Sequence, residues 1–124
     1  MSRFKNWKKP EFDEDGWAFV IGQNAFDTKK FGWRCQYPEG LKLGDGVDIG
    51  CFSYLNARYG IEIGDDVQIG GCCLIYSDNT ENKTHGKIVI GKGALIGSHS
   101  LILPNAVIKP YSKIKAYSII KGEQ

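Results

Sequence analysis

A large aliphatic side chain returns at every sixth position through most of the chain after residue 42. The series contains only Ile and Leu and falls into groups separated by two longer intervals: Leu43, Ile49 and Leu55; Ile63, Ile69 and Ile75; and Ile90, Ile96, Ile102, Ile108, Ile114 and Ile120. Self-similarity at a fixed period is the sequence signature of a repeat architecture, in which each unit stacks on its neighbours.

A second set of mostly small residues stands two positions before these aliphatic residues: Val47, Ser53, Ile61, Val67, Cys73, Ile88, Ala94, Ser100, Ala106, Ser112 and Ser118. Residues two apart in a strand share a face, so both sets are expected to point inward. Three such hexads close a triangular coil, and stacked coils that pair in parallel form a solenoid. In six hexads the aliphatic residue is followed by glycine (Gly44, Gly50, Gly64, Gly70, Gly91 and Gly97), which predicts a turn with positive φ at that residue.

The composition agrees with a β-rich single domain of 124 residues. The 14 Ile outnumber the 7 Leu and 6 Ala, an order that disfavours a helical bundle and favours strands. With 16 Gly but only 4 Pro, the chain is neither collagen-like nor Pro-rich. Its 42% hydrophobic and 24% charged residues also disfavour intrinsic disorder.

The net charge of +2 is too balanced to indicate a nucleic-acid-binding surface. No apolar stretch has the length of a signal-peptide core or a membrane span, so we expect a cytoplasmic protein with no membrane partner. The four cysteines, at positions 35, 51, 72 and 73, lack the spacing of a zinc site. We therefore expect reduced thiols and no metal.

Two strings carry a family resemblance: Ile63-Gly64-Asp65-Asp66-Val67-Gln68 with Ile69-Gly70 following, and Ile90-Gly91-Lys92-Gly93-Ala94-Leu95-Ile96-Gly97. They resemble the hexapeptide-repeat acyltransferases, a family that includes the sugar, maltose and galactoside O-acetyltransferases. The resemblance implies an all-β fold, the left-handed parallel β-helix, with about four coils, a loop insertion and assembly as a homotrimer. Residues 43–124 would form this helix, and residues 1–42 an aromatic-rich cap with the first coil.

Six aromatic residues before the repeat are expected to cover the open N-terminal end of the solenoid: Trp7, Phe12, Trp17, Phe19, Phe31 and Trp33. One isolated hexad, residues 21–26, also precedes the continuous repeat. We expect packing roles for these residues.

The repeat is interrupted twice, and each interruption follows the third hexad of a group. Leu55 and Ile63 are eight residues apart, and Ile75 and Ile90 are fifteen apart. Both insertions should therefore lie at the same corner on successive coils, one above the other. Insertions in repeat proteins map to loops on one face, where binding and catalysis concentrate. This corner is the predicted functional site.

The longer insertion, residues 76–86, is polar and contains His85, one of two histidines. Members of the resembled family often carry in such a loop the histidine that acts as general base. A base assists the attack of a hydroxyl or amine on a thioester carbonyl, and imidazole changes protonation near neutral pH. His99 lies one hexad further on, at a turn or facing outward, and is the second candidate base, a group that orients the base, or a pantetheine contact. Ordinary solvated or packing roles remain the alternatives for both.

The resemblance also implies substrate contacts. Asn56, in the shorter insertion, stands where related sugar acetyltransferases offer an amide to the acceptor, and Arg58 and Asn79 lie near it in the two insertions. Ser98 and Ala116 stand where family members line the acyl-CoA arm. Backbone amides would stabilise the oxyanion.

The predicted function is therefore transfer of an acetyl group from acetyl-CoA to a hydroxyl or amine of a small-molecule acceptor, a sugar or nucleotide-sugar. The alternative is a non-catalytic β-helix scaffold or assembly subunit. A zinc hydratase of the carbonic-anhydrase type, which uses this fold with three histidines, is disfavoured because the chain has only two.

Overall fold

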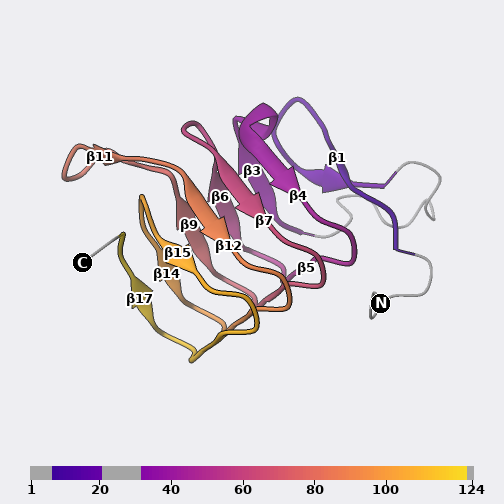
Figure 1. Cartoon of the computed structure of the whole chain (residues 1–124). Coiled ribbons are helices and arrows are strands. Elements are labelled where there is room, and N and C mark those ends of the chain that lie inside the picture. Colours follow the sequence, from indigo (N-terminus) through magenta and orange to yellow (C-terminus); the bar gives the residue numbers. More distant parts are fainter. Residues whose placement is uncertain (1–6, 21–31, 123–124) are drawn as a thin grey trace.

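The computed structural model describes residues 7–20 and 32–122. Within them the regular secondary structure consists of short β-strands joined by turns, with one short 3-10 turn, Pro38–Gly40. Three parallel sheets run along the molecule (Figure 1). Sheet I contains β4 (Leu41–Leu43), β7 (Ile61–Ile63), β12 (Ile88–Ile90) and β15 (Val107–Ile108). Sheet II contains β5 (Asp48–Ile49), β8 (Gln68–Ile69), β13 (Leu95–Ile96) and β16 (Lys113–Ile114). Sheet III contains β3 (Arg34–Gln36), β6 (Tyr54–Asn56), β9 (Leu74–Tyr76), β14 (Leu101–Ile102) and β17 (Ile119–Ile120).

The register of these sheets follows the hexad period. Ile63 pairs with Leu43 on one side and Ile90 on the other, so each coil places its aliphatic residue directly over the one below. The chain passes from sheet I to II to III and back in each coil, which defines a first, second and third corner at these three passages. The predicted all-β solenoid of about four stacked coils is confirmed.

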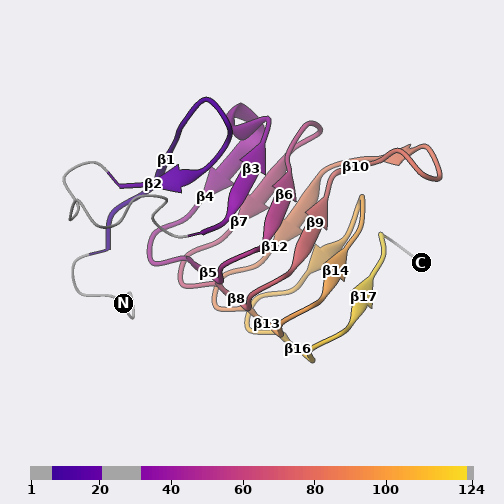
Figure 2. The ribbon, with the colours of Figure 1, turned by 180° about the vertical axis from the view of Figure 1, so that it is seen from behind.

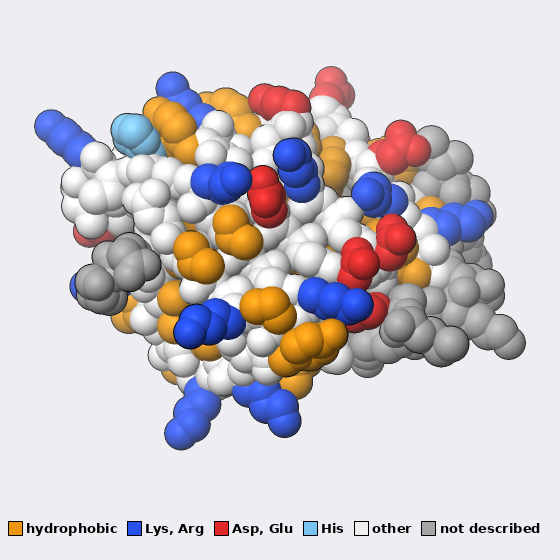
Figure 3. All heavy atoms as spheres, viewed as in Figure 1, with side chains coloured by type: hydrophobic (Ala, Val, Ile, Leu, Met, Phe, Trp, Pro, Cys, Tyr) orange, Lys and Arg blue, Asp and Glu red, His pale blue; other side chains and the backbone are white. Residues whose placement is uncertain are grey.

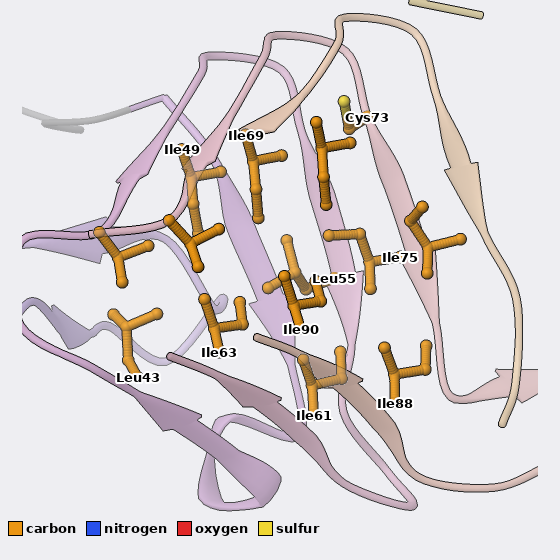
Figure 4. Close-up of a cluster of buried hydrophobic side chains, with 14 of the residues drawn as sticks. Leu43, Ile49, Leu55, Ile61, Ile63, Ile69, Cys73, Ile75, Ile88 and Ile90 are labelled. Carbon is orange, nitrogen blue, oxygen red and sulfur yellow. The ribbon is translucent and has the colours of Figure 1, made fainter. Parts of the chain in front are cut away.

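The core is the stack of inward side chains between the three sheets (Figure 4). Of the twelve periodic aliphatic residues, all but Ile114 and Ile120 are buried. These two belong to the last coil, which has a coil on one side only among the described residues. Burying an Ile side chain fully stabilises the fold by about 1.5–3 kcal/mol, so the column is the main source of stability.

The expected role of the periodic glycines is wrong in one respect. The residues with positive φ stand three positions after the aliphatic residue, not one: Gly46, Phe52, Asp66, Cys72, Gly93, His99, Asn105, Tyr111 and Tyr117. The glycine directly after the aliphatic residue is required by close approach of the next coil. A Cβ at Gly91 would lie 2.4 Å from the backbone N of Pro110, and one at Gly97 2.3 Å from that of Ala116.

The N-terminal segment packs against the first coils. The strands β1 (Glu11–Phe12) and β2 (Ala18–Phe19) form an antiparallel pair. Phe12 contacts buried Trp33 edge to face, with ring centroids 5.6 Å apart, and Trp7 Nε1 donates to Val47 O at 2.9 Å. Strand β3, which precedes residue 43, already pairs in parallel with β6. Phe31 and the isolated hexad at residues 21–26 lie outside the described residues.

Candidate functional site

Both insertions lie at the third corner, as their position after the third hexad predicts. The shorter one joins β6 to β7, and the longer one joins β9 to β12 on the next coil. The longer insertion folds as an antiparallel hairpin of β10 (Asp78–Asn79) and β11 (Thr84–His85). This hairpin projects from the body of the solenoid (Figures 1 and 2).

Ser77 fixes the base of the hairpin to the coil below it. Its side chain is fully buried, and Oγ donates to Asn56 O at 2.7 Å while accepting from Tyr59 N at 2.9 Å. Ser77 N also donates to Asn56 O, at 2.9 Å. Buried polar groups of this kind hold a backbone firmly because losing one partner leaves the other unsatisfied. These hydrogen bonds of Ser77 therefore connect the two insertions where they leave the solenoid.

Two side chains of the shorter insertion contact two of the hairpin. Arg58 Nη1 lies 3.3 Å from Asp78 Oδ2, and the Arg58 guanidinium lies over the ring of Tyr59 at 5.4 Å. The imidazole of His85 stacks on Tyr59, with ring centroids 4.2 Å apart and an interplanar angle of 18°. His85 is otherwise exposed. The structure thus brings together Arg58, Tyr59, Asp78 and His85, a set we term the third-corner cluster.

Asn56 and Asn79 also lie at the third corner, but the side chain of each accepts a hydrogen bond from the backbone of its own turn. Asn56 Oδ1 accepts from Arg58 N at 3.1 Å, and Asn79 Oδ1 accepts from Glu81 N at 3.3 Å. Such bonds from a side-chain oxygen to the backbone two residues on stabilise turns. Asn79 also pairs with Thr84, which places it on the hairpin face opposite His85.

The second corner gathers Ser98, His99 and Ala116. Ser98 O accepts from Tyr117 N at 3.0 Å, so the turns that carry Ser98 and Ala116 stack directly. The imidazole of His99 stacks on Tyr117, with centroids 4.9 Å apart and an interplanar angle of 15°. Both His99 and Tyr117 are exposed. His99 therefore lies at a turn facing outward, as the register predicts.

The two histidines lie at different corners of a single chain, so the structure does not bring His85 together with Ser98, His99 or Ala116. Sequence reasoning missed Tyr117 as the stacking partner of His99. A signal was present, because Tyr117 follows His99 by eighteen residues, which is one coil of three hexads.

The thiols of Cys35 and Cys73 are core groups. Burial, reinforced by the charge of Glu39, raises the pKa of Cys35 from its usual 9.0 to about 12, and burial also raises the pKa of Cys73. All four cysteines are unpaired thiols. Across residues 7–20 and 32–122, no group of three or more His, Cys, Asp and Glu side chains is arranged to hold a metal ion.

Charged side chains of both signs intermix on the face that carries sheet I (Figure 3). Glu62, on the inner strand β7 of sheet I, has its Oε2 3.0 Å from Lys87 Nζ and 3.9 Å from Lys42 Nζ, and the Lys87 hydrogen bond lowers the pKa of this carboxyl group. In the described part of the chain, no helix has the length and hydrophobicity needed to cross a membrane.

No protein-family model matches the chain, and no curated protein matches it in sequence. Two solved structures with a similar trace are of AntD, an N-acyltransferase from Bacillus cereus. A mutant in complex with dTDP and coenzyme A has a TM-score of 0.48 and 19% identity, over 82% of this chain and 85% of that chain. A complex with dTDP and 3-hydroxybutyryl-CoA has a TM-score of 0.43 and 20% identity, over 73% and 72% of the two chains. At these values the likeness concerns the course of the chain alone.

Proposed function

We propose that this protein is a CoA-dependent acyltransferase that moves an acetyl group from acetyl-CoA to a hydroxyl or amine of a sugar or nucleotide-sugar. The observation that carries the proposal is the meeting of the two insertions, which places exposed His85 against Tyr59 and beside the Arg58–Asp78 ion pair. The hexad repeat and its resemblance to the hexapeptide-repeat acyltransferases supply the reaction class.

In this reaction His85 accepts the proton of the acceptor hydroxyl or amine while that group attacks the thioester carbonyl. The C–S bond then breaks, the acyl group stays on the acceptor, and the proton passes from His85 to the CoA sulfur, which leaves as the thiol. Stacking on Tyr59 limits rotation of the imidazole, which favours proton transfer in one direction. Arg58 remains half-exposed beside Asp78 and provides a positive charge for a polar acceptor. No covalent enzyme intermediate is required when both substrates bind together.

The acyl-CoA arm is proposed to lie along the second corner, where Ser98 and Ala116 stack on successive coils and His99 lies beside them. Since one chain holds these residues and His85 at different corners, we propose a homotrimer in which the third corner of one copy faces the second corner of the next. Each interface then forms one complete site.

The test combines two variants, His85→Ala and His99→Ala, with acetyl-CoA and a panel of sugars and amino sugars, and CoA thiol release is measured. His85→Ala is expected to lose about 10²–10⁴-fold in kcat, the usual contribution of general acid–base catalysis, and His99→Ala to lose activity because the acyl-CoA arm loses a contact. Refolding an equal mixture of the two should restore about one quarter of wild-type activity, because one interface in four receives both intact histidines.

Full activity in both single variants would exclude a histidine base. Activity lost in both but not restored by mixing would exclude a site shared between copies. Calorimetry with acetyl-CoA provides the check on the reaction class: no binding heat, together with no thiol release across the panel, would favour the scaffold alternative.

A further inference from the structure

The third-corner cluster has one further aromatic contact, which comes from the preceding coil. The guanidinium carbon of Arg58 lies over two rings, 5.4 Å from the centroid of Tyr59 and 5.8 Å from that of Tyr37. Tyr37 belongs to the passage from β3 to β4, whereas Arg58 belongs to the passage from β6 to β7 on the next coil. A row of planar side chains thus runs along the third corner from Tyr37 to His85.

The backbone of Tyr37 differs from that of the residues at the same place in the next two coils. By the strand register, Ala57 and Ser77 occupy the equivalent places, and both are fully buried. Tyr37 instead has left-handed backbone angles, φ 60° and ψ 56°, and is 37% exposed. A left-handed conformation is unfavourable for a residue with a Cβ and persists only where the surrounding structure holds it. The turn therefore directs the Tyr37 side chain outward at the corner rather than into the core.

The turn that follows Tyr37 is fixed against the shorter insertion. Gly40 N donates to Tyr37 O at 2.9 Å and closes the 3-10 turn that begins with Pro38. Ala57 N donates to Gln36 O at 3.0 Å, and Ala57 O leaves no room for a Cβ at Gly40. The ring of Tyr37 is consequently held at a fixed distance from that insertion.

Arg58 connects this ring to the hairpin. Its Nη1 lies 3.3 Å from Asp78 Oδ2, and Asp78 pairs directly with His85 in the hairpin. The side chain of Arg58 is half-exposed, and an unrestrained arginine side chain samples many rotamers. The two tyrosine rings limit these rotamers, because the guanidinium is attracted to the face of each ring. Loss of one ring should therefore loosen the ion pair and, with it, the hairpin.

We propose that Tyr37 is a positioning residue for acyl transfer. Its ring holds the Arg58 guanidinium against Asp78, and this ion pair keeps the hairpin, and thus the imidazole of His85, in one orientation. Tyr37 itself contacts no reacting atom. This inference rests on the proposed function for the chemistry, but the effect of Tyr37 on the hairpin can be measured without substrate.

The first experiment measures hydrogen exchange of the hairpin amides, residues 78–86, in wild type, Tyr37→Leu and Tyr37→Phe. Tyr37→Leu should accelerate this exchange about two- to fivefold, the factor that corresponds to one exposed cation–π contact. Tyr37→Phe keeps the face of the ring and should exchange like wild type. The matched control is Tyr111→Leu, since Tyr111 is also an exposed tyrosine with positive φ but lies at the first corner. It should leave hairpin exchange unchanged.

A double variant tests whether Tyr37 acts through Arg58. In the Arg58→Met background, Tyr37→Leu should have no further effect on hairpin exchange, whereas independent contributions would add. In the acyl-transfer assay, Tyr37→Leu should lower kcat about two- to fivefold and Tyr37→Phe should keep the wild-type value. The KM for acetyl-CoA should not change, because the acyl-CoA arm is assigned to the second corner. A role of Tyr37 in general stability alone would not separate kcat from KM in this way.

Unchanged hairpin exchange in Tyr37→Leu, or additive effects in the double variant, would overturn the positioning role. Acyl transfer by the wild type at a rate that Tyr37→Leu leaves unaltered would refute the role of Tyr37 alone. Absence of acyl transfer by the wild type would refute the proposed function and with it the role of Tyr37 in that reaction. Coupled exchange in that case would leave Tyr37 and Arg58 as supports of the hairpin only.

Discussion

At the scale of single residues, the four cysteines illustrate how position in the hexad decides chemistry. Cys35 and Cys73 take inward positions and are fully buried, whereas Cys51 is exposed and Cys72 half-buried at the second corner. Reactivity of a thiol requires the thiolate and access to it. The two inward thiols have neither, because burial raises the pKa of both.

We therefore expect a thiol reagent at pH 8 to modify Cys51 first and Cys72 more slowly, with Cys35 and Cys73 modified only after unfolding in urea. Raising the pH from 8 to 10 should leave Cys35 protected in the folded protein, since burial raises the pKa of this thiol to about 12. Peptide mapping by mass spectrometry after timed quenching identifies each site. Four similar rates in the folded protein would contradict the assigned burial.

The same scale shows what the sequence could predict. The inward direction of the periodic Ile residues, and of Cys73 or Ser100 two positions earlier, follows from strand alternation and was predicted correctly. The reason for the periodic glycines was not predicted correctly. They are needed because the backbone of the next coil's turn comes close to them, and this depends on how the coils stack. A local rule about φ cannot contain that information.

At the scale of the element, the turn of each coil is contacted by the equivalent turn of the next coil along the solenoid. A Cβ at Gly91 would meet the backbone of the following coil at Pro110. Lys109, at the equivalent position of the next coil, carries a side chain and has no further coil above it among the described residues. At the position directly after the periodic aliphatic residue, glycine is thus found only at first and second corners that another coil covers.

Gly91→Ala is consequently expected to lower the free energy of unfolding by about 1–3 kcal/mol or more, as over-packing of a rigid site does. The matched control, Lys109→Ala, keeps a Cβ at the equivalent position and should change stability by less than about 0.5 kcal/mol, as exposed substitutions usually do. Urea denaturation of both variants provides the comparison. Equal stability of Gly91→Ala and wild type would mean that the coils are spaced more widely than described.

The hairpin is the element for which sequence reasoning was least complete. Two interruptions of the period were sufficient to predict that both insertions lie at one corner, because counting hexads fixes the corner of each turn. All residues of strands β10 and β11 are polar, so the two strands could not be predicted from alternating apolar and polar positions. The stacking of His85 on Tyr59 depends on the spacing between successive coils at the third corner, and this spacing cannot be predicted from the hexad period alone.

At the scale of the whole molecule, the solenoid is a stack in which each coil contacts only its neighbours. Stability of such a stack is approximately a sum of coil terms and nearest-neighbour interfaces. Ile75 and Ile120 occupy equivalent inward positions on sheet III, but Ile75 is fully buried and Ile120 only half-buried in the last coil. The same substitution at these two positions measures what a covering coil contributes.

Ile75→Ala should cost about 2–5 kcal/mol, because the cavity that it leaves is enclosed by coils on both sides. Ile120→Ala should cost clearly less, about 1–2 kcal/mol, since the site is open at one end and relaxes. In hydrogen exchange, amides of β16 and β17 should accordingly exchange before those of β8 and β9. Equal losses of stability in the two variants, with equally slow exchange, would contradict an open last coil and would mean that another chain covers this end in solution.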